Sequence, residues 1–305
     1  MSFRVADSGG RRHGEPAEPA LVPGVSPQIF GLRDFGRIAD LVRREAGIVL
    51  GEQKRMLAYS RLAPLVRQSG AQTFGDYLDR LRSDPAATAR AVAALTTNHT
   101  YFYREPHHFE HFAAEVRPAL IARAQAGEPV RLWSAGCSSG EEIWTLLMVL
   151  LGEERAAGRA LAGRDIVALA SDLAGHALRT AMAATYQRSA LDALPAALVR
   201  CWCEPVPDDP SPSLRIAEEL RAMLRFRQLN LLRDWPFKGR FDVIFCRNVM
   251  IYFDEPTKEQ LVLAFARQLH PGGHLYIGHS ERVSGPAGEL LTQVGATIYR
   301  RGEAA

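Results

Sequence analysis

The sequence lacks the features of an exported or membrane-spanning protein. No apolar run approaches the roughly 18 residues needed to cross a bilayer. The first residues, MSFRVADSGGRRHGEPAEPA, have no apolar core like that of a signal peptide. Only four cysteines occur among 305 residues, too few for a disulfide scaffold in a chain long enough to bury a large core. We therefore expect a cytoplasmic protein whose thiols are reduced and structural.

An excess of charge of one sign is also missing. The 37 Lys and Arg residues nearly balance the 34 Asp and Glu residues, which leaves a formal net charge of +3. Such a balance does not by itself imply binding to nucleic acid or insertion into a membrane, and neither is predicted. A chain with 47% apolar residues and this length is globular and suits two domains better than one.

Composition and the spacing of apolar residues divide the chain into four parts. Residues 1–27 are rich in Gly, Pro, Arg and Glu without an apolar period, which predicts a disordered arm. Residues 28–95 show helical spacing and predict a small domain of four helices. Residues 96–125 are interpreted as a linker that contributes to a site, because aromatic side chains alternate there with Asn, Thr and Arg. Residues 126–305 alternate strands with helices.

The alternation predicts an α/β fold with a doubly wound, mostly parallel sheet. The expected strands are Val130–Ser134, Asp165–Ser171, Leu224–Leu229, Phe241–Cys246 and His274–Gly278, with an edge strand over 296–300. Such sheets bind ligands at the carboxyl ends of their strands, so the residues that follow each strand become the candidates for a site.

The turn after the first strand reads Ser134-Ala-Gly-Cys-Ser-Ser-Gly-Glu141. It does not match the G-x-G-x-x-G dinucleotide fingerprint, and it lacks the lysine of a phosphate-binding loop. Glu141 and Glu142 would repel a pyrophosphate but suit a cationic cofactor such as S-adenosylmethionine, which carries a sulfonium and an ammonium group. Glu141 could equally complement the dipole of the helix that follows.

Polar side chains follow the other strands as well. Asp172 ends the second strand, where a carboxylate can accept hydrogen bonds from both ribose hydroxyls or cap a helix. Asn230 follows the third strand and could place its amide beside an adenine. Arg247 and Tyr252 follow the buried strand expected at Phe241–Cys246, which is unusual for a plain connection.

Two further groups of residues allow more than one interpretation. His99, His107, His108 and His111 suggest a metal site, but no carboxylate completes a familiar ligand set, so packing or capping is favoured and no metal is predicted. The basic residues Lys54, Arg55 and Arg61 lie on or beside one predicted helix. They form either a solvated helix face or a docking surface for an acidic partner.

Several motifs in this order resemble the CheR-type chemotaxis receptor methyltransferases. They are Leu95-Thr-Thr-Asn-His-Thr-Tyr-Phe-Tyr-Arg-Glu105, Ser134-Ala-Gly-Cys-Ser-Ser-Gly-Glu-Glu142, Ala170-Ser-Asp172, Phe245-Cys-Arg-Asn-Val-Met-Ile-Tyr-Phe253 and Gly278-His-Ser-Glu281. The resemblance covers about residues 30 to 300. It implies a class I S-adenosylmethionine-dependent methyltransferase domain behind the small helical domain, with a small β-subdomain inserted at about 188–222.

The resemblance also implies residue roles. S-adenosylmethionine, with S-adenosylhomocysteine as product, would be held by Asn98, Thr100, Arg104, Glu141, Asp172, Asn230, Leu231, Arg247 and Asn248. Arg104 and Tyr252 would lie near the reacting methyl group. The implied partners are cytoplasmic helices of methyl-accepting chemotaxis receptors. If the basic helix face is a docking surface, Lys54, Arg55 and Arg61 are its candidate residues, and a monomer is expected. The chain departs from the family pattern at Ile143-Trp-Thr145, Ala174 and Ala184.

The implied reaction is formation of a methyl ester on receptor glutamates. A glutamate with a reference pKa of about 4.3 is already an anion at neutral pH, so no general base is needed and alignment of the reactants is the main requirement. We expect Arg104 and Tyr252 to orient the carboxylate or the methyl group. The alternatives are a methyltransferase for a small carboxylate, or a scaffold protein that has kept the cofactor pocket.

Overall fold

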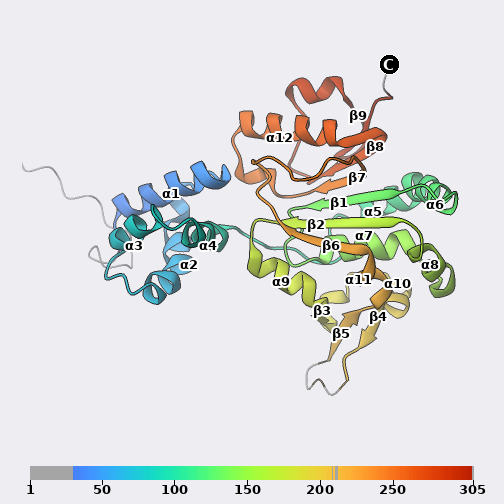
Figure 1. The fold of residues 1–305 in the computed structure, drawn as a ribbon, viewed down its shortest axis with the longest axis horizontal. Helices are drawn as coiled ribbons and strands as arrows, with labels where there is room; N and C mark the ends of the chain where they lie inside the picture. Colours follow the sequence, from blue (N-terminus) through green and yellow to red (C-terminus); the bar gives the residue numbers. More distant parts are fainter. Residues whose placement is uncertain (1–29, 208, 210–211, 304–305) are drawn as a thin grey trace, which may run out of the picture.

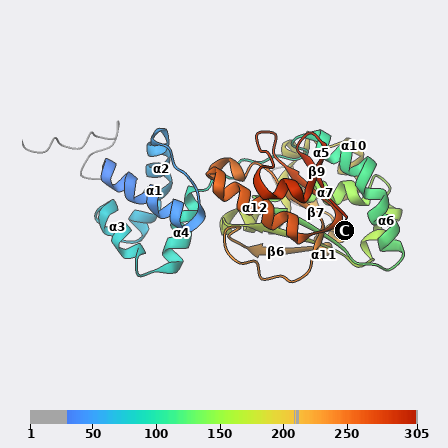
Figure 2. The ribbon, with the colours of Figure 1, turned by 90° about the horizontal axis from the view of Figure 1, so that it is seen from above.

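The computed structural model describes residues 30–207, 209 and 212–303, so the predicted disordered arm at 1–27 lies outside the described residues. Figures 1 and 2 show two bodies lying end to end, a small helical domain and a larger α/β domain, joined by an extended segment that follows α4. Among the described residues no helix is long and apolar enough to span a bilayer. All four cysteines are free thiols, three of them buried.

The helical domain contains the four helices that its apolar spacing predicts. They are α1 (Leu32–Ala46), α2 (Arg55–Gln68), preceded by the short 3-10 helix η1 (Glu52–Lys54), α3 (Phe74–Leu81) and α4 (Pro85–Leu95). Gly47 ends α1 at a φ of 66°, a left-handed conformation that favours glycine. Thr73 and Asp84 cap α3 and α4 by accepting backbone N–H groups with their side chains.

The larger domain is built on a seven-stranded sheet in the order β6-β2-β1-β7-β8-β10-β9. Its strands are β1 (Val130–Ala135), β2 (Ile166–Asp172), β6 (Leu224–Gln228), β7 (Phe241–Cys246), β8 (Leu269–Ile277), β9 (Leu291–Gly295) and β10 (Ile298–Arg301). The first five in this spatial order pair in parallel, and β10 and β9 are antiparallel. The predicted doubly wound, mostly parallel sheet is confirmed; β9 was not predicted.

Helices cover both faces of this sheet (Figure 1). On one face α12 (Glu255–Gln268) packs Phe265 against Trp133 of β1, with ring centroids 5.3 Å apart. The helices α7 (Glu141–Leu151), α8 (Arg155–Ala162) and α9 (Gly175–Ala183) belong to the opposite side. Two short 3-10 helices, η4 (Met250–Tyr252) and η5 (Gly285–Glu289), follow β7 and β8.

The predicted linker at 96–125 is extended only as far as Glu105. Beyond it lie α5 (Pro106–His111), a π-helical turn η2 (Phe112–Val116) and α6 (Arg117–Gln125). These turns form because Phe109, Phe112, Val116 and Leu120 recur at helical spacing, and all four are buried in the core of the α/β domain. Only the segment between Thr96 and Glu105 therefore crosses from one domain to the other.

A second sheet of three antiparallel strands stands between α9 and β6, in the order β3-β5-β4. Its strands are β3 (Thr185–Gln187), β4 (Cys203–Pro205) and β5 (Ser213–Ile216). The helices η3 (Arg188–Leu191), α10 (Ala196–Trp202) and α11 (Glu218–Met223) accompany it. Figure 1 places it on the opposite side of the main sheet from α12, away from the helical domain.

The two domains meet at the loops that follow α1 and β7. The backbone N–H of Val49 donates to the carbonyl oxygen of Tyr252 at 2.8 Å. The Asn230 amide donates to the carbonyl oxygen of Glu45 at 2.6 Å, and Arg43 pairs with Asp254 at 3.0 Å. These contacts set how the helical domain sits over the carboxyl ends of the parallel strands.

Candidate active site

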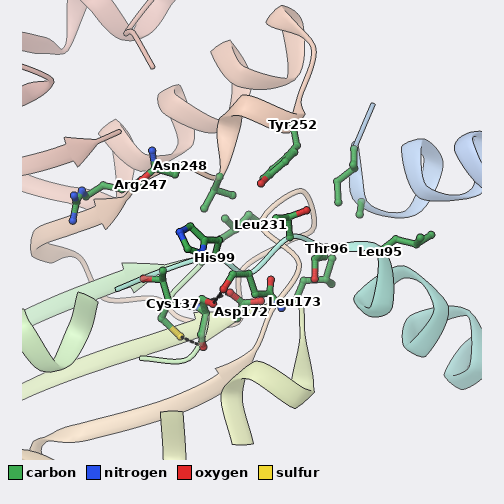
Figure 3. Close-up of a pocket in the computed structure, with 18 of the residues that line it drawn as sticks. Leu95, Thr96, His99, Cys137, Asp172, Leu173, Leu231, Arg247, Asn248 and Tyr252 are labelled. Carbon is green, nitrogen blue, oxygen red and sulfur yellow. Dashed lines mark hydrogen bonds between the residues drawn. The ribbon is translucent and has the colours of Figure 1, made fainter. Parts of the chain in front are cut away.

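A cavity lies between the two domains at the carboxyl ends of β1, β2, β6 and β7 (Figure 3). Ten of the residues predicted for the site line it: Lys54, Asn98, Thr100, Arg104, Asp172, Asn230, Leu231, Arg247, Asn248 and Tyr252. They come together because parallel strands present their carboxyl ends at one edge, and the segment after α4 crosses that edge.

The turn between β1 and α7 forms one wall. Gly136 lines the cavity at a φ of 86°, and a Cβ there would lie 2.4 Å from a Val249 methyl carbon, so only glycine fits. Ser138 also has a positive φ, 50°, and its backbone N–H donates to the Asp172 carboxylate at 2.8 Å. Its hydroxyl donates to the carbonyl oxygen of Asn98 at 2.9 Å. The turn, the second strand and the linker are thereby held together.

Asp172 ends β2 with a buried carboxylate that faces this turn. One oxygen accepts from the N–H of Ser138, and the other accepts from the N–H of Ala174 at 2.8 Å. Burial raises the pKa of this carboxyl group, and the two backbone hydrogen bonds oppose that rise. Each oxygen has a further lone pair, so the carboxylate can accept two more hydrogen bonds from a ligand in the cavity.

Of the two acids that begin α7, the cavity is lined by Glu142 and not by Glu141. The Glu141 carboxylate accepts instead from the Ser139 hydroxyl at 2.8 Å. Glu142 accepts from the Ser134 hydroxyl at 2.7 Å and pairs with Arg247 at 3.3 Å. Burial raises the pKa of both carboxyl groups. Glu141 and Glu142 are adjacent, so their side chains point about 100° apart on the helix and only one of them faces the cavity. Which one does so depends on how the helix packs, and the sequence alone does not show this.

The Asn230 side chain is already engaged within the chain. Its amide donates to the Glu45 carbonyl oxygen, and its own oxygen accepts from the N–H of Leu232 at 3.0 Å. The side chain thus contributes to the contact between domains, and its second N–H group and second lone pair are left for a ligand, so the predicted amide contact with an adenine stays a prediction. Asn230 and Leu231 still line the cavity, where their backbone and the Leu231 side chain are available to a ligand.

The three basic residues predicted to form a docking surface lie in different surroundings. Lys54 lines the cavity, with its ammonium nitrogen 5.1 Å from the centre of the Tyr252 ring. Arg55 donates to the carbonyl oxygen and the carboxylate of Glu52. Arg61 donates to the carbonyl oxygens of Leu95 and Thr96 at the end of α4. Arg61 thus fixes the start of the linker, and a docking role for these residues stays a prediction.

Arg104 and Tyr252 line the same cavity. Arg104 donates to the carbonyl oxygen of His99 at 3.0 Å, and its guanidinium lies over the Tyr101 ring at 5.6 Å. Tyr252 belongs to η4, and Figure 3 shows its ring directed into the cavity. In the same view the Arg247 side chain points away from Tyr252 and Asp172. Within the described part of the chain neither Arg104 nor Lys54 forms an ion pair with a carboxylate.

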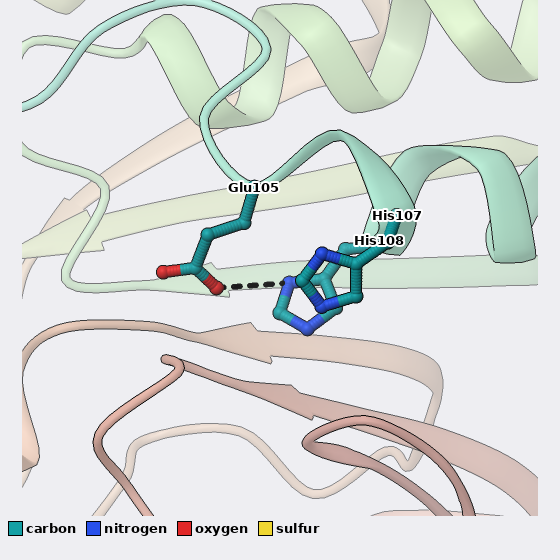
Figure 4. A group of neighbouring side chains, drawn as sticks. All are labelled: Glu105, His107 and His108. Atoms are coloured by element: carbon teal, nitrogen blue, oxygen red, sulfur yellow. Dashed lines mark ion pairs between the residues drawn. The ribbon is translucent and has the colours of Figure 1, made fainter.

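Behind Arg104 a carboxylate joins two of the histidines. Glu105, His107 and His108 place one potential ligand atom each within 4.8 Å of one another, with a Glu105 oxygen 3.4 Å from Nδ1 of His108 (Figure 4). Glu105 supplies the carboxylate that the histidine spacing alone did not indicate. The Arg247 guanidinium lies 3.3 Å from that same oxygen, however, and would repel a metal cation.

His108 predicts a loss of stability in mild acid. It is fully buried, and burial together with the nearby Arg247 and His107 lowers its pKa to about 3. The unfolded chain binds a proton below about 6.5, whereas the folded chain does not until far lower pH. Stability from this group is therefore full above pH 6.5 and is lost as the pH falls toward 3. Between pH 7 and pH 5 the loss is about 2 kcal/mol.

Urea unfolding at the two pH values measures this effect. His108→Gln removes the titrating ring and should reduce the difference in unfolding free energy between pH 7 and pH 5 by about 2 kcal/mol. The exposed His176 on α9 offers a matched control, and His176→Gln should leave the difference nearly unchanged. An equal pH dependence in His108→Gln and the unchanged protein would show that His108 does not carry it.

Sequence reasoning missed other residues of the site. His99, Tyr101 and Ser138 line the cavity, and all three stand inside the motifs quoted above. Glu281 is buried behind the cavity, where its carboxylate accepts from the backbone N–H groups of Asn248, Met250 and Gly278. An acid within one of the family motifs, directly after a predicted strand, was the sequence signal available for it.

Comparison with known proteins gives two family matches in succession. Residues 33–96 match the family described as CheR methyltransferase, all-alpha domain, and residues 98–300 match CheR methyltransferase, SAM binding domain. A probable chemotaxis protein methyltransferase of Rhizobium etli is 41% identical over 262 residues, which cover 85% of this chain and 96% of the relative. Chemotaxis protein methyltransferase 2 of Pseudomonas aeruginosa is 37% identical, covering 92% and 97%. The chemotaxis protein methyltransferase of Escherichia coli is 38% identical, covering 87% and 89%.

Proposed function

The chain belongs to the CheR methyltransferase family, and on that premise we propose that it methylates glutamate side chains of chemotaxis receptors, giving glutamyl methyl esters. Its fold is that of a class I methyltransferase, its activity is methyl transfer, and its cofactor is S-adenosylmethionine. The glutamate acceptor and the receptor partner are the proposed part. They follow from the chemistry of the cavity and from the names of the relatives.

The cavity fits this cofactor. Gly136 leaves room for a ligand beside the backbone of the turn, and Asp172 offers two carboxylate oxygens at the end of β2. We propose that Asp172 accepts hydrogen bonds from the ribose and that Asn230 and Leu231 enclose the adenine. Asn98, Thr100 and Asn248 complete the pocket from the linker and from β7.

A carboxylate acceptor is supported above all by the two cationic side chains that line the cavity with Tyr252. Arg104 and Lys54 form no ion pair among the described residues, whereas the lining acids Glu142 and Asp172 are held by Arg247 and by backbone N–H groups. Cationic side chains without an ion-pair partner, beside acids that already have partners, attract an anion. We propose that Arg104 and Tyr252 orient the glutamate carboxylate and that Lys54 draws it into the cavity.

The reaction needs no proton acceptor from the protein. When bound, S-adenosylmethionine supplies a methyl group on a sulfonium, and transfer to a carboxylate oxygen forms a carbon–oxygen bond as the carbon–sulfur bond breaks, leaving S-adenosylhomocysteine. The acceptor glutamate is already an anion at neutral pH. The task of Arg104 and Tyr252 is then to hold the acceptor in line and exclude water, which is catalysis by proximity and orientation.

Exposed apolar side chains around the cavity favour a protein as acceptor over a small carboxylate. Val49, Met56, Tyr101 and Ile251 are between 43% and 48% exposed, and each is a lining residue or the neighbour in sequence of one. Exposed apolar side chains on segments that line a site suit contact with another protein. We propose that a cytoplasmic receptor helix contacts these segments while one glutamate reaches Arg104.

Transfer of tritiated methyl groups to receptor-containing membranes tests the proposed function. Label on the receptor that is released by base would support a glutamyl methyl ester. Label on an added small carboxylate instead of the receptor would favour a methyltransferase that acts on small carboxylates. Cofactor binding with transfer to neither would favour a scaffold that has kept the pocket.

Arg104→Ala should lower the single-turnover rate of methyl transfer by about tenfold, because the acceptor loses a group that orients it. Arg104→Lys keeps the charge without the planar fork and should recover part of the rate. The exposed Arg267 on α12 is a suitable control, and Arg267→Ala should transfer at the unchanged rate. Full turnover by Arg104→Ala with normal cofactor affinity would contradict the orienting role.

A further inference from the structure

Arg104 stands in an unusual stretch of backbone. The residues on either side of it, Tyr103 and Glu105, both have a φ of 58°, although neither is glycine. Such a conformation is strained for a residue with a side chain and persists only where surrounding contacts enforce it. The Tyr103 N–H donates to the Thr145 hydroxyl at 3.2 Å, and the Tyr103 ring stacks on Phe109. Further contacts on this stretch come from Arg247, and from His279 and His108 on Glu105.

Arg247 reaches this stretch from the end of β7 with a side chain that is only 2% exposed. One nitrogen of its guanidinium donates to the carbonyl oxygen of Arg104 and lies 3.3 Å from the Glu105 carboxylate. Another nitrogen lies 3.3 Å from Glu142. The rings of Phe109 and Phe245 enclose the group, with their centres 5.5 and 6.0 Å from its carbon. The guanidinium therefore faces the protein behind Arg104 and not the centre of the cavity.

Glu105 is the second anchor of the same stretch. Its other carboxylate oxygen lies 3.1 Å from Nδ1 of His279. Burial raises the pKa of this carboxyl group, but Arg247 and His279 outweigh that effect and lower the pKa to about 2. Glu105 is therefore an anion throughout the neutral range and a constant partner for Arg247.

We infer that Arg247 and Glu105 are positioning residues that set the direction of Arg104, and that the Arg247 guanidinium is not a ligand of the cofactor. Arg247 holds the Arg104 carbonyl group while Glu105 ties the next residue to Arg247 and His279, so the Arg104 side chain is directed into the cavity. The inference rests on the proposed role of Arg104 in orienting the acceptor.

The chemistry of this position requires arginine. A buried cation loses its hydration and is retained only where several partners replace it. The planar guanidinium offers five N–H donors and can serve the Arg104 carbonyl, Glu105 and Glu142 together. A lysine ammonium is a compact charge on a flexible chain and does not span these three partners at once. Arg247→Lys thus keeps the charge but releases the Arg104 carbonyl group.

A double-mutant cycle on the full chain tests the inference. Arg247→Lys should lower the single-turnover rate at saturating S-adenosylmethionine by about tenfold. In a background that already carries Arg104→Ala the same substitution should have little further effect, because it acts through Arg104. Calorimetry should show affinity for S-adenosylhomocysteine within about threefold of the unchanged protein. Glu105→Gln should behave like Arg247→Lys.

Arg240 provides the matched control, because it is exposed at the opposite end of β7, and Arg240→Lys should change neither quantity. Loss of affinity in Arg247→Lys with an unchanged rate at saturation would make Arg247 a cofactor ligand and overturn the inference. Equal loss of rate in both backgrounds, as a general structural defect would produce, would overturn it as well. If receptors accept no methyl group but the coupling persists with a small carboxylate acceptor, the proposed function fails and the positioning inference stands.

Discussion

Asp172→Ala is expected to weaken S-adenosylmethionine binding by at least about a hundredfold, because each hydrogen bond to a charged group contributes about 1.5–3 kcal/mol. The carboxylate lines the cavity and has one free lone pair on each oxygen after accepting from Ser138 and Ala174. Alanine removes both acceptors for the ribose. It also leaves the Ser138 N–H without its partner, so the turn that forms the opposite wall loosens.

Calorimetric titration with S-adenosylhomocysteine measures the loss. Asp172→Asn keeps one oxygen and should bind more tightly than the alanine variant but more weakly than the unchanged protein. Asp165 lies just before the other end of β2 and is exposed, so Asp165→Asn should bind normally. An Asp172→Ala protein that is folded and binds with unchanged affinity would show that the ribose is held elsewhere.

The position of the cavity could be predicted because it depends on local patterns. Apolar runs such as Phe241–Cys246 mark buried strands, and the polar residues directly after them must gather at one edge of a parallel sheet. Asp172, Arg247 and Tyr252 were found in this way. The composition of residues 96–125 indicated a site there, but the roles of Asn98, Thr100 and Arg104 required the family resemblance, because no local pattern shows that an extended segment crosses the strand ends.

The direction of individual side chains could not be read in the same way. The Asn230 amide donates to the Glu45 carbonyl oxygen, and the Arg247 guanidinium donates to the Arg104 carbonyl oxygen. Both partners are more than a hundred residues away in the sequence, so neither contact is visible in a local pattern. Lys54 reaches the cavity only because the helical domain packs over the strand ends. Which lone pairs and cations remain for a ligand is decided by these long-range partners.

The strand β9 was missed for a related reason. Only Leu291 among its five residues is buried, so the alternation that marks a half-buried strand is absent at this edge. The helices after Glu105 are the opposite case. Phe109, Phe112, Val116 and Leu120 do show the helical period, and the aromatic residues just before them drew attention to a linker instead.

Glu281→Ala is expected to lower the unfolding free energy by about 3–5 kcal/mol and to slow methyl transfer together with it. The Glu281 carboxylate is buried and accepts from the N–H groups of Gly278 at 2.6 Å, Met250 at 2.7 Å and Asn248 at 3.2 Å. It therefore fastens the loop after β7 to the end of β8. Asn248 has a φ of 59°, so part of that loop is also held in a left-handed conformation.

Two separate costs add up in the alanine variant. Three backbone N–H groups lose their acceptor in an interior that water reaches poorly, and each unpaired group costs about 1–3 kcal/mol. The loop also carries Tyr252, whose ring faces the cavity, so release of the loop moves a group that orients the acceptor. A loss of this size is a large fraction of the 5–15 kcal/mol that stabilises a typical domain.

Glu281→Gln separates the two costs. Its remaining carbonyl oxygen can still accept from part of the loop, while its NH₂ group faces donors, so stability should fall less than in the alanine variant. Urea unfolding gives the free energies, and single-turnover transfer at a temperature where each variant is folded gives the rates. Glu289, exposed at the end of η5, is the matched control, and Glu289→Ala should change stability by no more than about 0.5 kcal/mol. If Glu281→Ala proved as stable and as active as Glu289→Ala, the loop that carries Tyr252 would have to be held by contacts other than this carboxylate.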